Sequence, residues 1–183
     1  PDVISLHREL SEIKKKGINH VILEASSHGL SQGRVNGLNF KTAIFTNFSQ
    51  DHLDYHKNMK NYLRAKLILF SKLLKEKKNI ITDNQINEFI KLKKIAKTKN
   101  QNLFTIGVRN STIRLNSISH KNNSQQLYLK YNKKKYSIEV PLIGLFQVKN
   151  LLMSVLAARL LGLDIKTILR NIKKIKEVNG RLQ

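Results

Sequence analysis

Residues 42–56 read "TAIFTNFSQDHLDYH", an apolar run followed at once by a cluster of polar side chains. The apolar part, 42–48, is almost uninterrupted, which is typical of a strand buried on both faces of a parallel sheet. The run "HVILEA" at 20–25 has the same character, and we expect it to form a second strand of that sheet. Ligands of open parallel sheets bind outside the carboxyl ends of the strands. The polar side chains after each run therefore predict a ligand site at one edge of the sheet.

Helix and strand patterns alternate along the first part of the chain, which is the order expected of a parallel α/β sheet. Between about 110 and 142 the pattern changes to short segments of alternating polar and apolar residues, joined by polar turns. This change predicts a small antiparallel β-meander. We therefore predict an α/β fold with a mostly parallel sheet, flanking helices and the meander. The other predicted elements are helices at 2–16, 58–75, 84–97, 147–163 and 165–175, and strands at 79–82 and 103–107.

The length and composition fit one globular domain. The chain has 183 residues, 40% of them hydrophobic, and contains no cysteine, which excludes disulfides and thiolate metal sites. No apolar run approaches the roughly 20 residues that span a bilayer, so we expect no membrane insertion. The start, "PDVISLHREL", lacks the features of a signal peptide and has no initiating methionine, so we expect a fragment of a longer protein.

The charge balance leaves two interpretations open. Lys and Arg number 34 against 12 acidic residues, a formal net charge of +22, as in many nucleic-acid-binding modules. The lysines are nevertheless scattered along polar faces instead of clustering with aromatic residues. We interpret them as solvated surface and expect no nucleic-acid partner. The alternative is that they give electrostatic help in binding an anionic ligand or nucleic acid.

The stretch "ILEASSHGLSQGRV", 22–35, runs from the first apolar strand into a group of polar side chains. Glu24 stands where a buried strand should still be apolar, and Arg34 has the planar fork that clamps a phosphate or a carboxylate. The alternative is a capped turn entering a short helix. The other side chains predicted to line the crevice are Ser26, Ser27, His28 and Gln32.

The stretch after the second strand offers potential metal ligands. Asp51, His52, Asp54 and His56 lie within six residues, and carboxylates with spare water positions suit magnesium. The alternative is that Asp51 caps a helix and the histidines only pack or form hydrogen bonds.

Lys66 falls inside the apolar stripe of the helix predicted at 58–75. Burial among apolar groups lowers the pKa of a lysine, and a neutral amine is available for modification or catalysis. The alternative is that its side chain extends along the helix surface and keeps the amine in water.

Five segments together closely resemble the Mur ligases, in the order that the family has them: "EASSHGLSQGRV", "FTNFSQDHLDYH", "NYLRAKLILF", "GLFQVKNLL" and the final "NGR". The resemblance implies that 1–178 are most of the family's central, ATP-binding domain, with its nucleotide-binding sheet. The family's phosphate-binding loop of the G-T-x-G-K-T type is not in the sequence. We assign 179–183 to the start of a linker toward a C-terminal ligase domain, and we expect this chain to be inactive alone.

Within the family, the segments look most like the cytoplasmic ligases that add the third amino acid of the peptidoglycan stem peptide. Such an enzyme joins meso-diaminopimelate or lysine to UDP-N-acetylmuramoyl-L-alanyl-D-glutamate, using ATP and Mg²⁺, through an acyl phosphate. The alternative within the fold is a folylpolyglutamate synthase, which "SSHGLSQGRV" resembles less well. The alternative from another class is a basic nucleic-acid-binding module.

The resemblance also implies roles for single residues. Glu24 and His52 would bind Mg²⁺, and Lys66 would be carbamylated, which turns its amine into an anionic metal ligand. The side chains that would hold the UDP-N-acetylmuramoyl-dipeptide are Ser26, Gln32 and Arg34.

Three further residues would contact ATP. Asn150 would lie near the nucleotide, and Arg181 in "NGR" would reach it when the C-terminal domain closes. Gln147 stands where the family often has Asn, and keeps the amide group on a longer side chain.

Overall fold

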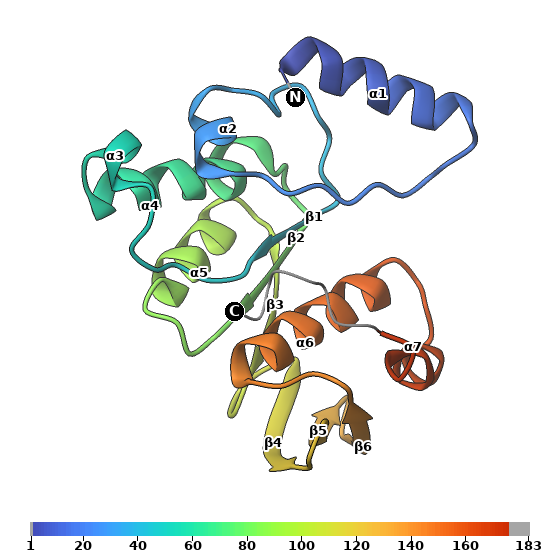
Figure 1. Cartoon of the computed structure of the whole chain (residues 1–183). Helices are drawn as coiled ribbons and strands as arrows, with labels where there is room; N and C mark the ends of the chain where they lie inside the picture. Colours follow the sequence, from blue (N-terminus) through green and yellow to red (C-terminus); the bar gives the residue numbers. More distant parts are fainter. Residues whose placement is uncertain (1, 176–183) are drawn as a thin grey trace.

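The computed structural model describes residues 2–175, in which six strands form one sheet in the order β1-β2-β3-β4-β5-β6 (Figure 1). The first four strands pair in parallel and the last three pair antiparallel. The predicted α/β class and the antiparallel meander are therefore confirmed, and the meander continues the parallel sheet. The strands are β1 Thr42–Phe45, β2 Asn79–Asp83, β3 Asn102–Gly107, β4 Ile113–His120, β5 Gln125–Tyr131 and β6 Lys134–Val140.

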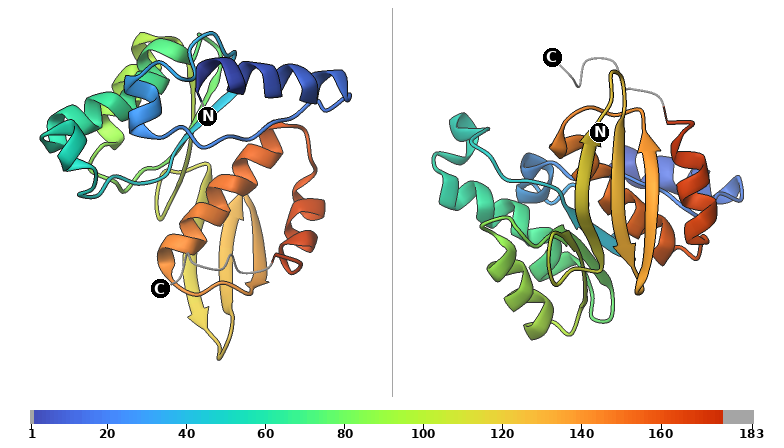
Figure 2. Two further views of the ribbon diagram at one scale, coloured as in Figure 1. Left: turned by 45° about the horizontal axis from the view of Figure 1, so that its top comes forward. Right: turned by 90° about the horizontal axis from the view of Figure 1, so that it is seen from below.

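Helices cover both faces of the sheet, as Figures 1 and 2 show. Ile80 and Ile81, adjacent in β2, are both fully buried and belong to two different apolar clusters. Successive strand residues point to opposite faces, so one cluster joins β1 and β2 to α2, α4 and α5, and the other joins the sheet to α6 and α7. The helices are α1 Val3–Lys15, α2 Ser27–Ser31, α3 Leu53–His56, α4 Met59–Ile68, the π-helix η1 Leu69–Leu73, α5 Phe89–Thr98, α6 Leu145–Leu160 and α7 Ile165–Ile172.

The strand predicted at 20–25 is wrong. Residues 18–26 have no regular secondary structure, and the side chain of Ile22 is 92% exposed. A strand is stabilised by its neighbours, and in the described part of the chain β1 pairs only with β2. The apolar run therefore has β propensity without a pairing partner.

The helix predicted at 58–75 is divided, because α4 continues into a π-helical turn at η1. Tyr62, Leu63 and Phe70 are buried, whereas Met59 and Leu73 are only partly buried. The extra residue in a π-turn rotates the positions after it, which places Leu74 in the core instead of Leu73. The helix predicted at 84–97 begins only at Phe89, after a turn.

No helix in the described range 2–175 is long and apolar enough to cross a membrane. The boundary predicted at 178/179 lies outside the described residues.

Candidate functional site

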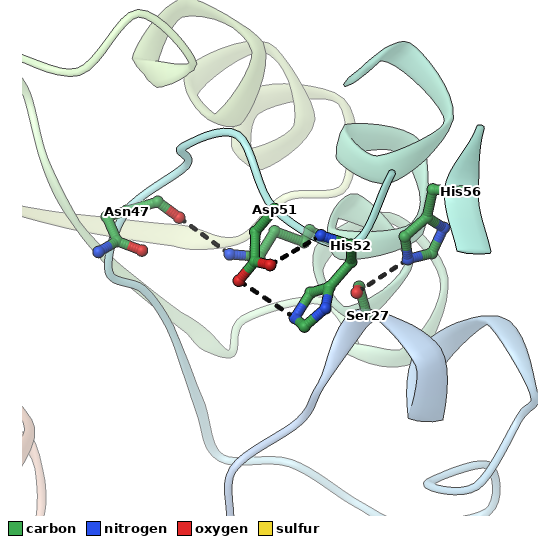
Figure 3. Close-up of polar contacts among 6 residues, drawn as sticks. Ser27, Asn47, Asp51, His52 and His56 are labelled. Atoms are coloured by element: carbon green, nitrogen blue, oxygen red, sulfur yellow. Dashed lines mark hydrogen bonds and ion pairs between the residues drawn. The ribbon is translucent and has the colours of Figure 1, made fainter. Parts of the chain in front are cut away.

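Two polar segments, 26–34 and 47–56, lie side by side next to β1 and α4 (Figure 3). Their closest polar link joins His56 Nε2 to Ser27 Oγ at 2.9 Å. Both side chains are buried, at 6% and 2% exposed. The ring of His56 also stacks on Tyr62 of α4, with centroids 5.2 Å apart. Burial lowers the pKa of His56, and the charges of His28 and His52 lower it further.

The first segment presents its polar side chains from α2. Ser26 is the N-cap, and its Oγ accepts a hydrogen bond from Gly29 N at 3.1 Å, as is typical of serine at a helix start. A Cβ on Gly29 would lie 3.2 Å from Ser26 Oγ and 3.7 Å from Arg34 Cδ, so glycine lets both side chains lie against the helix. Gln32 Nε2 donates to the hydroxyl of Tyr55 in α3 at 3.4 Å. Ser26, Gln32 and Arg34 are exposed.

The second segment bends sharply at His52, whose φ of 55° is left-handed. Its backbone N–H donates to Asp51 Oδ1 at 2.8 Å, and its Nε2 lies 3.4 Å from Asp51 Oδ2. The imidazole also lies edge-on to His28, with centroids 4.9 Å apart. Left-handed φ values are uncommon for residues other than glycine, and histidine is among the residues that adopt them more readily.

Lys66 points its amine toward the same region. Its Nζ donates to the carbonyl of Asn47 at 3.0 Å and lies 5.2 Å from the centroid of the Tyr62 ring. Burial lowers the pKa of Lys66, and the carboxylates of Asp51, Glu88 and Glu24 partly oppose that shift. Glu24, Asp51 and Lys66 are thus close enough for their charges to interact, and the ring of His52 lies 5.9 Å from that of Tyr62.

The predicted metal ligands need one chemical change to fit Mg²⁺. Among residues 2–175, no group of three His, Cys, Asp or Glu side chains is arranged to hold a metal ion. A protonated lysine repels a cation, but its carbamate carries one negative charge shared by two oxygens, which are ligands of the kind that magnesium prefers. Glu24, His52 and a carbamylated Lys66 would therefore form a chemically suitable set.

Gln147 and Asn150 lie in the first turns of α6, where both are partly buried. Lys149, between them, forms an ion pair of 2.6 Å with Asp83 Oδ2. Asp83 ends β2 and is 1% exposed. This ion pair attaches the start of α6 to the carboxyl end of the strand next to β1. Arg181 lies outside the described residues.

The family model described as Mur ligase middle domain matches residues 1–158. The chain belongs to this family.

Curated relatives match the whole length of the chain. A protein of Rickettsia conorii is 32% identical over 182 residues, and one of Bradyrhizobium diazoefficiens is 35% identical over 188 residues. Both are named UDP-N-acetylmuramoyl-L-alanyl-D-glutamate–2,6-diaminopimelate ligase, and the chain covers 38% and 39% of their lengths. A solved structure of a ligase with this name matches 100% of the chain and 38% of its own, with a TM-score of 0.90 and 28% identity.

Sequence reasoning missed two contacts of this Mur ligase middle domain. Ser27 was expected to line the crevice, but its hydroxyl points inward to His56. In the sequence, Lys149 does not differ from the many other lysines. It differs in the structure because it forms an ion pair with the buried Asp83. The one signal in the sequence was Asp83, because a charged residue at the end of a buried strand predicts a nearby residue of opposite charge.

Proposed function

We propose that the protein carrying this chain is an ATP-dependent, cytoplasmic ligase that joins meso-diaminopimelate to UDP-N-acetylmuramoyl-L-alanyl-D-glutamate. One observation carries the proposal: relatives named for this reaction match every part of the chain at 32–35% identity. Lysine is the alternative third amino acid.

The reaction has two steps. A carboxylate oxygen of the bound dipeptide attacks the γ-phosphorus of ATP, which releases ADP and leaves an acyl phosphate. The amine of the third amino acid then attacks the acyl carbon, loses a proton and expels phosphate. Both steps gather negative charge, which cationic and hydrogen-bonding groups stabilise.

The exposed side chains of α2 and the turn after it supply the groups for the muramoyl-dipeptide. Arg34 offers a bidentate fork to a carboxylate or phosphate, and Gln32 offers an amide. Ser26 accepts from Gly29 N through its oxygen, so the hydroxyl proton can still be donated to the substrate.

Glu24, His52 and carbamylated Lys66 would hold Mg²⁺, which shields the negative charge of the phosphates. Carbamylation needs a neutral amine to react with carbon dioxide, and the lowered pKa of Lys66 favours that form. Asp51 holds the imidazole of His52 in place. Asn150, Gln147 and Arg181 are assigned to ATP.

The test uses the longest reading frame that contains this chain. ADP release is followed with ATP, Mg²⁺ and UDP-N-acetylmuramoyl-L-alanyl-D-glutamate, with diaminopimelate or lysine in separate reactions. We expect release that depends on diaminopimelate. Dependence on lysine would correct the substrate, and release with neither from a folded, ATP-binding protein would favour a folylpolyglutamate synthase. Salt-sensitive binding of generic RNA without any nucleotide response would favour the nucleic-acid-binding module.

A further inference from the structure

The hydrogen bond between His56 and Ser27 is the buried link between the two segments that carry the proposed site. Ser27 is the first residue of α2 and follows Ser26, and His56 ends α3, one turn after His52. The assigned substrate and metal side chains on these segments are exposed, whereas this pair is not. The pair therefore does not contact the substrate directly.

The helices that it joins are too short to hold their own positions. α2 has five residues and α3 has four, and isolated helices of one turn are unstable in water. Tertiary contacts must therefore set their orientation. Leu30 of α2 is 4% exposed and packs in the apolar cluster that contains Leu63 of α4, and polar links join α2 to α3. The other polar link, from Gln32 to Tyr55, is longer at 3.4 Å and exposed. The His56 ring is in addition fixed by its stacking on Tyr62.

We propose that His56 is a positioning residue, which through its hydrogen bond to Ser27 holds the substrate-binding helix α2 at a fixed orientation relative to His52. This inference rests on the proposed function. The pair sets the positions of Ser26 and Gln32 relative to His52, the proposed metal ligand. Its loss weakens binding of the muramoyl-dipeptide more than binding of ATP, which is assigned to α6.

Two substitutions of His56 separate positioning from simple packing. His56→Phe keeps a ring that can stack on Tyr62 but leaves the buried hydroxyl of Ser27 without its partner. His56→Gln keeps an amide nitrogen or oxygen at about the reach of Nε2. Because an unsatisfied buried group has a large penalty, we expect His56→Phe to raise KM for UDP-N-acetylmuramoyl-L-alanyl-D-glutamate about tenfold. KM for ATP should change by less than about twofold. In His56→Gln, KM for the dipeptide substrate should return most of the way to its value in the unaltered enzyme.

A control removes a polar contact of a histidine in the meander, outside segments 26–34 and 47–56. In the meander, Gln125 Nε2 lies 3.0 Å from His120 Nδ1, and Gln125 is buried. His120→Phe should lower the thermal midpoint without altering either KM. Ser27→Ala should reproduce the KM effect of His56→Phe, and the double variant should show no further increase.

The assay with the full reading frame distinguishes the two proposals. An unaltered enzyme that releases no ADP overturns the proposed function. An active enzyme in which His56→Phe leaves the dipeptide KM unchanged, or raises both KM values equally, overturns the positioning role. Failure of His56→Gln to restore KM in a folded protein also counts against it.

Discussion

The meander β4–β6 and the short helices α2 and α3 are held in place by different interactions. In the meander, β5 and β6 form a continuous ladder, and the ladder of β4 and β5 has one register shift between Leu115 and Ser117. Apolar side chains pack between the strands and α6. α2 and α3 have few residues and are joined by polar contacts such as His56–Ser27. The meander therefore gains its shape from its own packing. The site region combines the packing of Leu30 in the apolar cluster that α2 shares with α4 with a few polar links, and it exposes its predicted binding side chains to a ligand.

The largest effect on activity is expected at Lys66, in the site region. Lys66→Ala removes the proposed anionic metal ligand, so ADP release should fall by about a hundred- to a thousandfold, as for other lost electrostatic groups. Acetate, a small carboxylate, should restore part of the rate by occupying the vacated volume. Lys72→Ala, at an exposed lysine in η1, is the control and should leave the rate unchanged. Full activity of Lys66→Ala would remove Lys66 from the proposed site.

The largest effect on stability is expected at the ion pair that joins α6 to the sheet. Lys149→Met leaves the carboxylate of Asp83 buried without a counter-charge, which should lower the free energy of unfolding by about 3–5 kcal/mol. Urea denaturation of the chain measures the change. Adding Asp83→Asn should recover much of it, because an uncharged amide is less costly to bury. Equal stability of Lys149→Met and the unaltered chain would show that the ion pair contributes little.

Within the meander, Leu127 is fully buried between neighbouring strands and α6. Leu127→Ala should lower the free energy of unfolding by about 2–5 kcal/mol, through lost burial and the cavity that remains. The rate of ADP release per folded molecule should stay the same. A specific loss of activity in this variant would mean that the meander contributes to the site directly.

The sequence predicted the meander well and the site region only in part, for a physical reason. In β4–β6 the alternation of polar and apolar residues identifies both faces of each strand. The run at 20–25 has no such alternation, and its structure depends on strands that pair with it. The polar side chains after the two runs were correctly expected to lie near one another, but the inward turn of Ser27 depends on a residue 29 positions away. The partner of Lys149 is equally a tertiary contact.

A smaller effect is expected from the pH dependence of stability in the site region. Burial holds the pKa of His56 below its ordinary value of 6.5. Just below that pH, His56 therefore binds a proton in the unfolded chain but stays neutral in the folded chain. The free energy of unfolding should therefore fall as pH drops from about 6.5 toward the folded pKa, by at most about 1.4 kcal/mol per pH unit. Urea denaturation of His56→Phe across this range should show a shallower slope. Parallel slopes in both proteins would mean that His56 titrates normally.

The smallest effect is expected at Ile22, and it tests the comparison most directly because the change resembles Leu127→Ala. Ile22 is 92% exposed and lies in the segment without regular structure, so Ile22→Ala should change the free energy of unfolding of this chain by less than about 0.5 kcal/mol. Denaturation of both variants under the same conditions gives the difference. If Ile22→Ala proved as destabilising as Leu127→Ala, Ile22 would be packed in solution, as the neighbouring Leu23 and Ala25 are against the apolar cluster. The site region would then rely on apolar packing as much as the meander does, and the contrast between the two regions would disappear.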